Sequence, residues 1–262
     1  MSIICPLFSG STGNSTYIEI KEGGLLIDAG VSAKSIFQAI SRINADISNI
    51  KAVAVTHCHS DHIKGLKTVL KKTGAKLVAT EGTVEFLRNE DYILPNTEIV
   101  ITNGDLQDID GFGIKSFNTS HDSFGSCGYS VFLPNGKKFS LCTDTGIITE
   151  EIGDSISGSD VVLLESNHDI DMLKKGPYPP LLKVRIMSDV GHISNSVCAG
   201  QVLKLFKTGT SRFILGHLSL NNNTELLAQS ASESVLMDLG AENGNDYILT
   251  VAKPNENGVT VI

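Results

Sequence analysis

The chain has 262 residues, five cysteines and a net charge of −8. A chain of this length buries one large core or at most two, and we expect a single domain over residues 1–262. No apolar run approaches the about 18 residues of a membrane span, and no basic leader with an apolar stretch opens the chain, so the sequence predicts neither membrane insertion nor a signal peptide. The acidic balance disfavours nucleic-acid binding through bulk charge, although bound divalent ions would reverse the sign locally.

Short apolar and β-branched runs predict strands over residues 3–7, 15–20 and 25–30. A helical pattern follows over residues 32–43, with Ser32 as its N-cap. Further along the chain we expect strands at 51–56, 76–80, 161–164, 212–215, 247–251 and 259–262, a strand block from 98 to 143 with a hairpin at Pro134-Asn135-Gly136, and helices at 63–72, 82–89, 196–206 and 224–239. Antiparallel strand blocks interleaved with helices predict an α+β fold in which two sheets pack together with helices outside.

The segment His57-Cys58-His59-Ser60-Asp61-His62 carries the densest chemistry of the chain. It follows a buried strand and precedes a helix, where side chains of one loop converge on one point. His57 and His59 lie two residues apart and project from the same side of an extended turn, while Asp61 and His62 enter the helix and face a second position. The spacing predicts a site for two metal ions, with Cys58 pointing the other way. The five cysteines show no CxxC pairing, which is typical of free thiols and predicts a cytoplasmic protein.

Three further segments place a histidine or an aspartate directly after a β-type run: Asn118 to Asp122, Leu141 to Gly146 and Ile214 to Ser219. Together with the first motif, their order along the chain resembles the metallo-β-lactamase fold superfamily of hydrolases. The resemblance implies a four-layer αββα sandwich and two divalent ions, zinc or manganese with iron also tolerated. It implies that one ion binds His57, His59 and His121, that the other binds Asp61, His62 and His217, and that Asp144 bridges them.

The same resemblance implies catalytic and supporting roles for three carboxylates. Asp61 would also orient the bridging hydroxide, which acts as the nucleophile. Asp28 and Glu165, each at the end of a strand, are candidates to hold the outer ring nitrogen of a metal-binding histidine. Without the resemblance, either carboxylate is equally well explained as a helix cap or loop residue.

Two loops point to phosphate as the substrate group. The loop from Ser9 to Thr16 offers amides and hydroxyls for an anion, with Ser11, Thr12 and Asn14 as contacts, although an ordinary hairpin turn explains it as well. In Gly191-His192-Ile193-Ser194-Asn195, Ser194 or Asn195 would cap a helix whose N-terminus favours phosphate.

These loops, with Glu165 to Asp169 and Gly176 to Pro179, resemble the YycJ/WalJ-type branch, which is related to ribonucleases Z and J. The branch implies a DNA exonuclease in which catalytic His192 meets the scissile phosphate or the leaving oxygen. His168 would either line the cleft and meet phosphate or only stabilise its loop. DNA is favoured over RNA as the partner. Only about fifty residues separate Glu165 from His217, too few for the inserted domain of the ribonuclease J relatives.

Two alternatives stay open from the sequence. A thioesterase or lactonase would keep the metals but would not need the loop around His192. A metal-dependent nucleic-acid-binding protein without turnover would not need both complete ligand sets. The native metal, the strand preference, the direction of digestion and the oligomeric state are not determined by these patterns.

Overall fold

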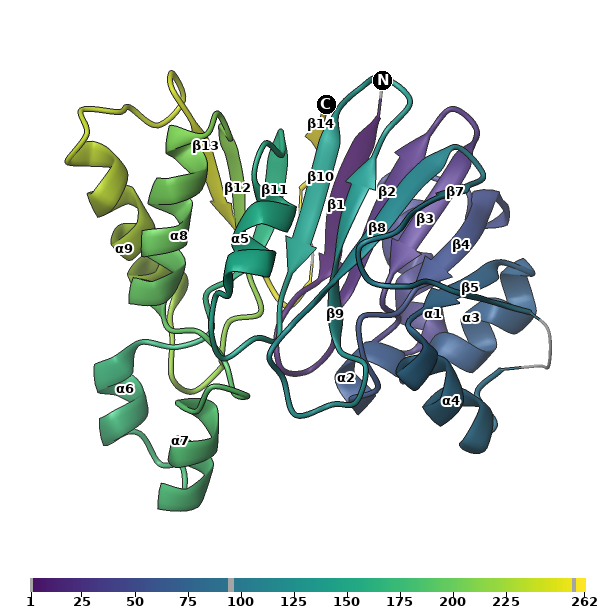
Figure 1. Cartoon of the computed structure of the whole chain (residues 1–262), viewed down its shortest axis with the longest axis horizontal. Helices are drawn as coiled ribbons and strands as arrows, with labels where there is room; N and C mark the ends of the chain where they lie inside the picture. Colours follow the sequence, from purple (N-terminus) through teal and green to yellow (C-terminus); the bar gives the residue numbers. More distant parts are fainter. Residues whose placement is uncertain (1, 94–96, 256–257) are drawn as a thin grey trace.

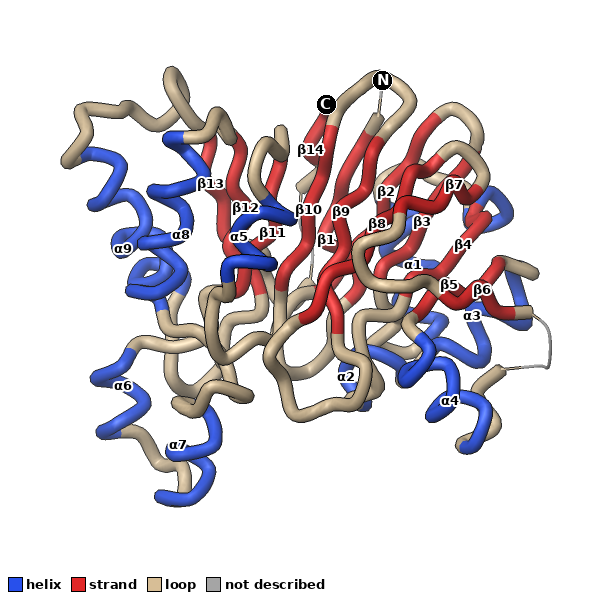
Figure 2. The backbone as a smooth tube through the Cα atoms, in the orientation of Figure 1, coloured by secondary structure: helices blue, strands red, loops and turns tan. Residues whose placement is uncertain are grey.

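The computed structural model describes residues 2–93, 97–255 and 258–262, which form two facing β-sheets with helices on the outer sides (Figures 1 and 2). The strands of the first sheet lie in the order β14-β1-β2-β3-β4-β5-β6. Their bounds are β1 Ile3–Phe8, β2 Ser15–Ile20, β3 Gly23–Ile27, β4 Ile50–Ala54, β5 Lys76–Ala79, β6 Glu98–Val100 and β14 Thr260–Val261.

The second sheet has the strand order β13-β12-β11-β10-β9-β8-β7. Its strands are β7 Leu106–Ile109, β8 Phe112–Asn118, β9 Cys127–Phe132, β10 Lys138–Cys142, β11 Val161–Glu165, β12 Arg212–Gly216 and β13 Ile248–Val251. Both sheets are mixed, so the expectation of antiparallel blocks is only half right. β3 to β6 and β10 to β13 pair in parallel, because helices connect these strands and return the chain to the same edge.

The helices cover the outer faces of the two sheets. Against the first sheet lie α1 Ala33–Arg42, α3 Leu66–Thr73 and α4 Glu81–Asn89. Against the second lie α5 Glu150–Ile156, α8 Asn195–Lys207 and α9 Glu225–Met237. The remaining short helices are η1 Ile47–Asn49, α2 Ser60–Ile63, α6 Ile170–Lys175 and α7 Pro180–Ile186.

Three apolar clusters fill the spaces between these four layers. Between the sheets, Ile18 and Leu25 of the first meet Phe112, Tyr129 and Phe139 of the second, all fully buried. A second cluster joins the first sheet to α1, α3 and α4, and a third joins the second sheet to α5, α8 and α9. Burial of apolar surface on both faces of each sheet holds the layers together, and the expected αββα sandwich is confirmed.

Several helices differ from the sequence prediction. The expected helix over 63–72 is interrupted at residues 64 and 65, so the chain forms α2 and then α3. At the break, Gly65 lets the Val31 carbonyl approach closely, because an added Cβ would lie 2.3 Å from that oxygen. The helices α5, α6 and α7 were not predicted, because runs of six or seven residues are too short to show a helical period. Ser32 does cap α1, since its hydroxyl accepts from the Ser35 amide at 3.1 Å.

The two ends of the chain lie side by side, because β14 pairs antiparallel with β1 (Figure 1). Within residues 2–93, 97–255 and 258–262, every helix is too short or too polar to cross a bilayer.

One edge of the sandwich collects the polar motifs. The segments with His57, His121, Asp144 and His217 follow β4, β8, β10 and β12 respectively, and Glu165 ends β11. All these strands end at the same edge, shown at the bottom of Figure 1. The facing of the two sheets therefore brings residues from five separate strands to one place.

Several buried hydrogen bonds join the sheets close to this edge, and the shortest of them involves Tyr129. The Tyr129 hydroxyl on β9 donates to the Val55 carbonyl, just after β4, at 2.7 Å. We expect Tyr129→Phe to lower the free energy of unfolding by about 1–2 kcal/mol, because the buried carbonyl loses its donor. Urea unfolding at constant metal concentration measures the change. Tyr178→Phe removes a solvent-exposed hydrogen bond to Asn221 and should stay within about 0.5 kcal/mol of the parent protein. Equal effects of the two variants would contradict this account.

Candidate metal centre

Three histidines converge just beyond β4 and β8. His57 Nε2 lies 3.1 Å from His59 Nδ1, which lies 3.2 Å from His121 Nε2. Burial lowers the pKa of His57 well below its ordinary value and also lowers the pKa of His59, so both rings stay neutral and keep lone pairs available. Three imidazole nitrogens that lie close together form the donor set that a zinc-like ion takes in proteins.

A second group surrounds the buried carboxylate of Asp144. Its Oδ2 lies 3.3 Å from His62 Nε2 and 3.0 Å from His217 Nδ1, and Asp61 Oδ2 lies 3.5 Å from His62 Nε2. The other Asp144 oxygen lies 3.8 Å from His121 Nε2, so this carboxylate stands between the two groups. The structure thus brings together all seven residues that the sequence pattern selected as ligands.

The charges around Asp144 are strongly coupled. Burial alone would raise the pKa of Asp144, but His217 and His62 outweigh it and hold this pKa well below the ordinary range. Burial likewise disfavours protonated His62 and His217, yet Asp144 overcomes it and raises their pKa values to about 9 and about 10. Binding of a cation would take the place of these protons, because a histidine ligand must be neutral at the coordinating nitrogen.

Two polar atoms at the centre have no hydrogen-bond partner. Asp144 Oδ2 and His217 Nδ1 are buried, and although they are close, their geometry is not that of a hydrogen bond. Unpaired buried polar atoms are costly, and a bound cation would satisfy them. The residues present therefore fit a divalent metal ion.

Backbone conformation at the site supports the same conclusion. Asp28, Asp144 and His217 have positive φ angles of 63°, 57° and 54°. Such angles are uncommon outside glycine and asparagine and persist where the surrounding structure requires them. Each of the three follows the end of a strand and turns its side chain inward.

Asp28 fixes the orientation of His62 from behind. Its Oδ2 lies 2.8 Å from His62 Nδ1 and accepts a hydrogen bond from the Thr56 hydroxyl at 2.9 Å. Its Oδ1 accepts a hydrogen bond from the Thr56 amide at 2.8 Å. His62 Nε2 is thereby turned toward Asp144. The structure places Asp28 where the sequence suggested, behind the histidine loop.

The Glu165 carboxylate contacts His192, which is not one of the seven proposed metal ligands. Its Oε1 lies 2.8 Å from His192 Nδ1, and its Oε2 accepts from the Ile193 amide at 3.2 Å. Burial would lower the pKa of His192, but the Glu165 carboxylate outweighs it and raises this pKa. His192 Nδ1 lies 3.7 Å from Asp144 Oδ1, so His192 stands at the edge of the metal site, where the sequence pattern placed a catalytic side chain.

The loop after β1 supports the metal site from inside rather than offering its amide outward. Asn14 is buried, its Oδ1 accepts from the Gly10 amide at 3.0 Å, and its Nδ2 lies 3.3 Å from Asp61 Oδ2. The same Nδ2 lies 3.0 Å from His62 Nε2, so Asn14, expected as a phosphate contact, instead contacts two candidate ligands, Asp61 and His62. Ser11 and Thr12 are exposed at the tip of the turn. Sequence reasoning missed Ser9, whose hydroxyl accepts from the His217 amide at 2.8 Å.

The loop before α8 is likewise held by internal contacts. The Ser194 hydroxyl caps α8 by accepting from the Val197 amide at 3.4 Å. Asn195 is buried, and its amide group bonds to Ser166 and Asn223. These side chains shape the loop that carries His192 instead of pointing into open space. His168 is also buried, and its Nδ1 has no hydrogen-bond partner.

Cys58 and Asp122, which are adjacent in sequence to proposed ligands, make contacts outside the metal site. The Cys58 thiol points toward the Thr83 carbonyl of α4, at 3.7 Å, and belongs to none of the groups suited to a metal within the described ranges. Asp122, next to His121, forms an ion pair with Arg185 of α7 at 2.6 Å and lies 3.7 Å from His59 Nε2. Sequence reasoning did not predict this pair, because its two residues are 63 positions apart.

Comparisons with known proteins agree with this geometry. Residues 24–218 match the family described as the β-lactamase superfamily domain. The chain is 34% identical to exodeoxyribonuclease WalJ of Streptococcus pneumoniae over 252 residues, which cover 95% of this chain and 93% of that protein. It is 36% identical to exodeoxyribonuclease YycJ of Bacillus anthracis over 242 residues, 92% of this chain and 91% of that protein. Among solved structures, the metallo-β-lactamase fold protein YhfI of Bacillus subtilis superposes over the whole of both chains with a TM-score of 0.75 at 12% identity.

The converging nitrogens lead to a prediction about metal content. We expect His121→Ala to lose most of the metal that the parent protein retains after dialysis, because one of three nitrogens at the first position is removed. Cys58→Ser should retain the parent content, because its sulfur faces α4. Mass spectrometric metal analysis of both variants measures this. Loss of metal from Cys58→Ser, or full retention by His121→Ala, would show that the ligands are assigned wrongly.

Proposed function

This chain belongs to the β-lactamase superfamily of metallohydrolases, and we propose that it is a metal-dependent DNA exonuclease. The convergence of histidine and carboxylate donors on one edge of the sandwich carries the proposal: His57, His59, His62, His121, Asp144, Glu165, His192 and His217 form groups that could hold a metal, and Asp61 Oδ2 lies 3.5 Å from His62 Nε2. The relatives named exodeoxyribonuclease match over more than nine-tenths of this chain, which supports the substrate class.

The donor set supports two ions. We assign His57, His59 and His121 to one ion and Asp61, His62 and His217 to the other, with Asp144 shared. Mixed imidazole and carboxylate donors suit zinc or manganese and tolerate iron. When bound, the ions supply an activated water and positive charge for the phosphoryl oxygens.

The residues around the ligands then orient the reacting groups. Asn14 holds the Asp61 carboxylate, which would orient an attacking water by accepting its hydrogen bond. Glu165 fixes His192 through Nδ1, which leaves Nε2 free to donate a hydrogen bond or a proton to the leaving oxygen. His192 lies beside Asp144, within reach of a phosphate held at the same centre.

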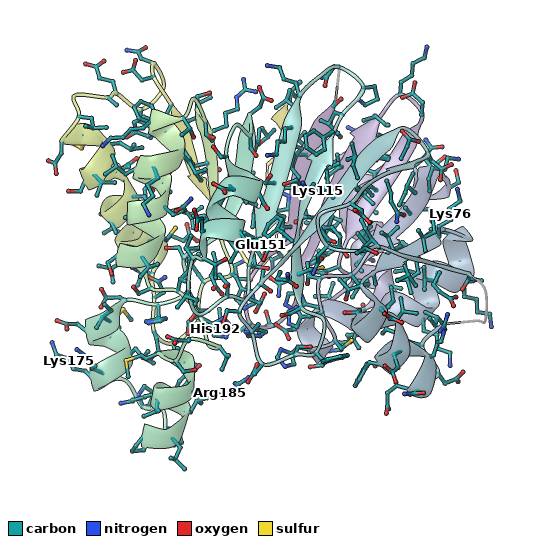
Figure 3. All side chains as sticks on the ribbon, in the orientation of Figure 1. Lys76, Lys115, Glu151, Lys175, Arg185 and His192 are labelled. Atoms are coloured by element: carbon teal, nitrogen blue, oxygen red, sulfur yellow. The ribbon has the colours of Figure 1, made fainter. Side chains whose placement is uncertain are left out.

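A nucleic-acid substrate suits the surface near the centre. The helices α6 and α7 carry four basic side chains, Lys174, Lys175, Lys183 and Arg185, and one acidic side chain, in a chain whose net charge is −8. Figure 3 shows Arg185 and Lys175 on this pair of helices, at the same edge of the molecule as His192. Basic side chains along a strand's path supply sequence-independent affinity for phosphates.

We favour DNA over RNA because of the named relatives, and the cytoplasm because the five cysteines form no disulfide.

Digestion of end-labelled substrates tests the proposal. With zinc or manganese supplied, we expect progressive shortening of single- or double-stranded DNA, and about a thousandfold or greater loss in His59→Ala, which removes a metal ligand. Lys76→Ala, an exposed change at an ion pair with Asp110, should leave the rate unchanged. Intact DNA and RNA with a fully metal-loaded protein would overturn the proposal and favour hydrolysis of a small thioester or lactone.

The His192–Glu165 pair gives a second prediction. Glu165→Gln should lower kcat by about 10-fold to 100-fold with the metal content unchanged, because the amide no longer fixes the His192 ring in one protonation pattern. Steady-state kinetics combined with metal analysis separates this outcome from loss of metal. An unchanged kcat would show that the reaction does not depend on Glu165 holding the His192 ring in position.

A further inference from the structure

A hollow of about 520 Å³ opens beside the metal centre, between α4 and the loop at residues 122–124. His59 and Asp122 form the wall that it shares with the metal site, and Phe86, Phe124, Glu85 and Asn89 are among its other lining residues. Its volume lies within the range of small-ligand pockets in proteins, about 300–1,000 Å³. No step proposed above uses it.

One face of α4 is built to line this hollow. Gly82, Glu85, Phe86 and Asn89 follow the spacing that places side chains on a single helical face, whereas Val84 and Leu87 on the other side are buried in the core. Phe86 remains 42% exposed although it is apolar. An aromatic ring left open at a pocket wall marks a surface that can stack against a planar ligand.

The second ring comes from the loop that follows His121. Phe124 is 81% exposed, and its ring lies against Gly82, where an added Cβ would come within 2.5 Å of the ring. The loop is anchored beside it, because the Thr80 hydroxyl donates to the Gly125 carbonyl at 2.6 Å. The missing side chain at position 82 therefore sets where the Phe124 ring rests.

The charge of the lining decides between a phosphate and a base. Glu85 and Asp122 are acidic, and no lysine or arginine occurs among the lining residues in the described part of the chain. A phosphate would be repelled, whereas a nucleobase stacks on aromatic rings and forms hydrogen bonds with groups such as the Asn89 amide and the Ser123 hydroxyl.

We propose that the hollow between α4 and residues 122–124 binds the nucleobase of a nucleotide flanking the scissile phosphate. The inference rests on the proposed nuclease function. His59 presents Nδ1 to the metal site while its Nε2 lies 3.7 Å from Asp122 at the hollow, so a base stacked there leaves its own phosphate at the metal centre. Basic α7 on the other side of Asp122 remains for the sugar–phosphate backbone.

The test compares DNA oligonucleotides that carry an abasic residue on either side of the cleavable bond. We expect the parent protein to lose about 10-fold or more in kcat/KM, through KM, when the base is missing at one of the two positions. Phe124→Leu should weaken cleavage of normal DNA to the same extent and show no further loss on the abasic substrate, because leucine keeps apolar area but cannot stack. Phe124→Tyr should behave like the parent protein.

Two further variants separate stacking from general damage. Gly82→Ala should reproduce part of the Phe124→Leu effect, because the added methyl group displaces the ring. Phe132→Ala, a partly exposed phenylalanine on β9, should not affect the discrimination. A direct readout is quenching of 2-aminopurine placed at the flanking position in an oligonucleotide with a phosphorothioate linkage.

The outcomes distinguish the two proposals. Equal cleavage of normal and abasic DNA at both positions, with no effect of Phe124→Leu, would overturn the base-binding hollow and leave the nuclease intact. Absence of any metal-dependent cleavage would overturn the nuclease proposal and the hollow with it.

Discussion

The buried carboxylate of Asp144 is the constraint around which the site is organised. A full negative charge under a sandwich of apolar layers is costly unless cations surround it. When protonated, His62 and His217 supply the compensating positive charge. Divalent ions would supply it as well and would also satisfy the unpaired atoms Asp144 Oδ2 and His217 Nδ1. The side chains around Asp144 therefore fit a bound cation.

Holding this charge in place requires support from both sheets. Asp28 and Thr56 fix His62 from the first sheet, while Glu165 fixes His192 from the second. The loop after β1 adds Ser9 and Asn14, which hold His217 and Asp61. Positive φ angles at Asp28, Asp144 and His217 are the local cost of aiming these side chains inward. Packing between the sheets offsets that cost.

Charge is divided around the site in a way that suits an acidic protein acting on DNA. Basic side chains gather on α6 and α7, and the ion pair between Arg185 and Asp122 ties this basic region to the loop of His121. On the opposite side of Asp122, the hollow is aromatic and acidic. A strand with its phosphates toward the basic helices and a base in the hollow would satisfy both surfaces. The overall charge of the chain thus carries little information about its partner.

Local patterns were sufficient for most strands, the main helices and the segment from His57 to His62, whereas His121, Asp144 and His217 became candidate ligands through the resemblance to a known family. The segment from His57 to His62 contains four candidate ligands within six residues, and His121, Asp144 and His217 each follow a recognisable strand. Parallel pairing and the break near Gly65 were not predictable, since they depend on neighbours distant in sequence, and the helices α5 to α7 are too short to show a helical period. The inward role of Asn14, the pairing of Glu165 with His192, the Arg185–Asp122 bridge and the hollow beside α4 depend on the same long-range contacts. The sequence by itself thus determined which side chains are candidates for the chemistry, whereas the tertiary structure decided what each one faces, because only the packing of two sheets brings their strand ends together.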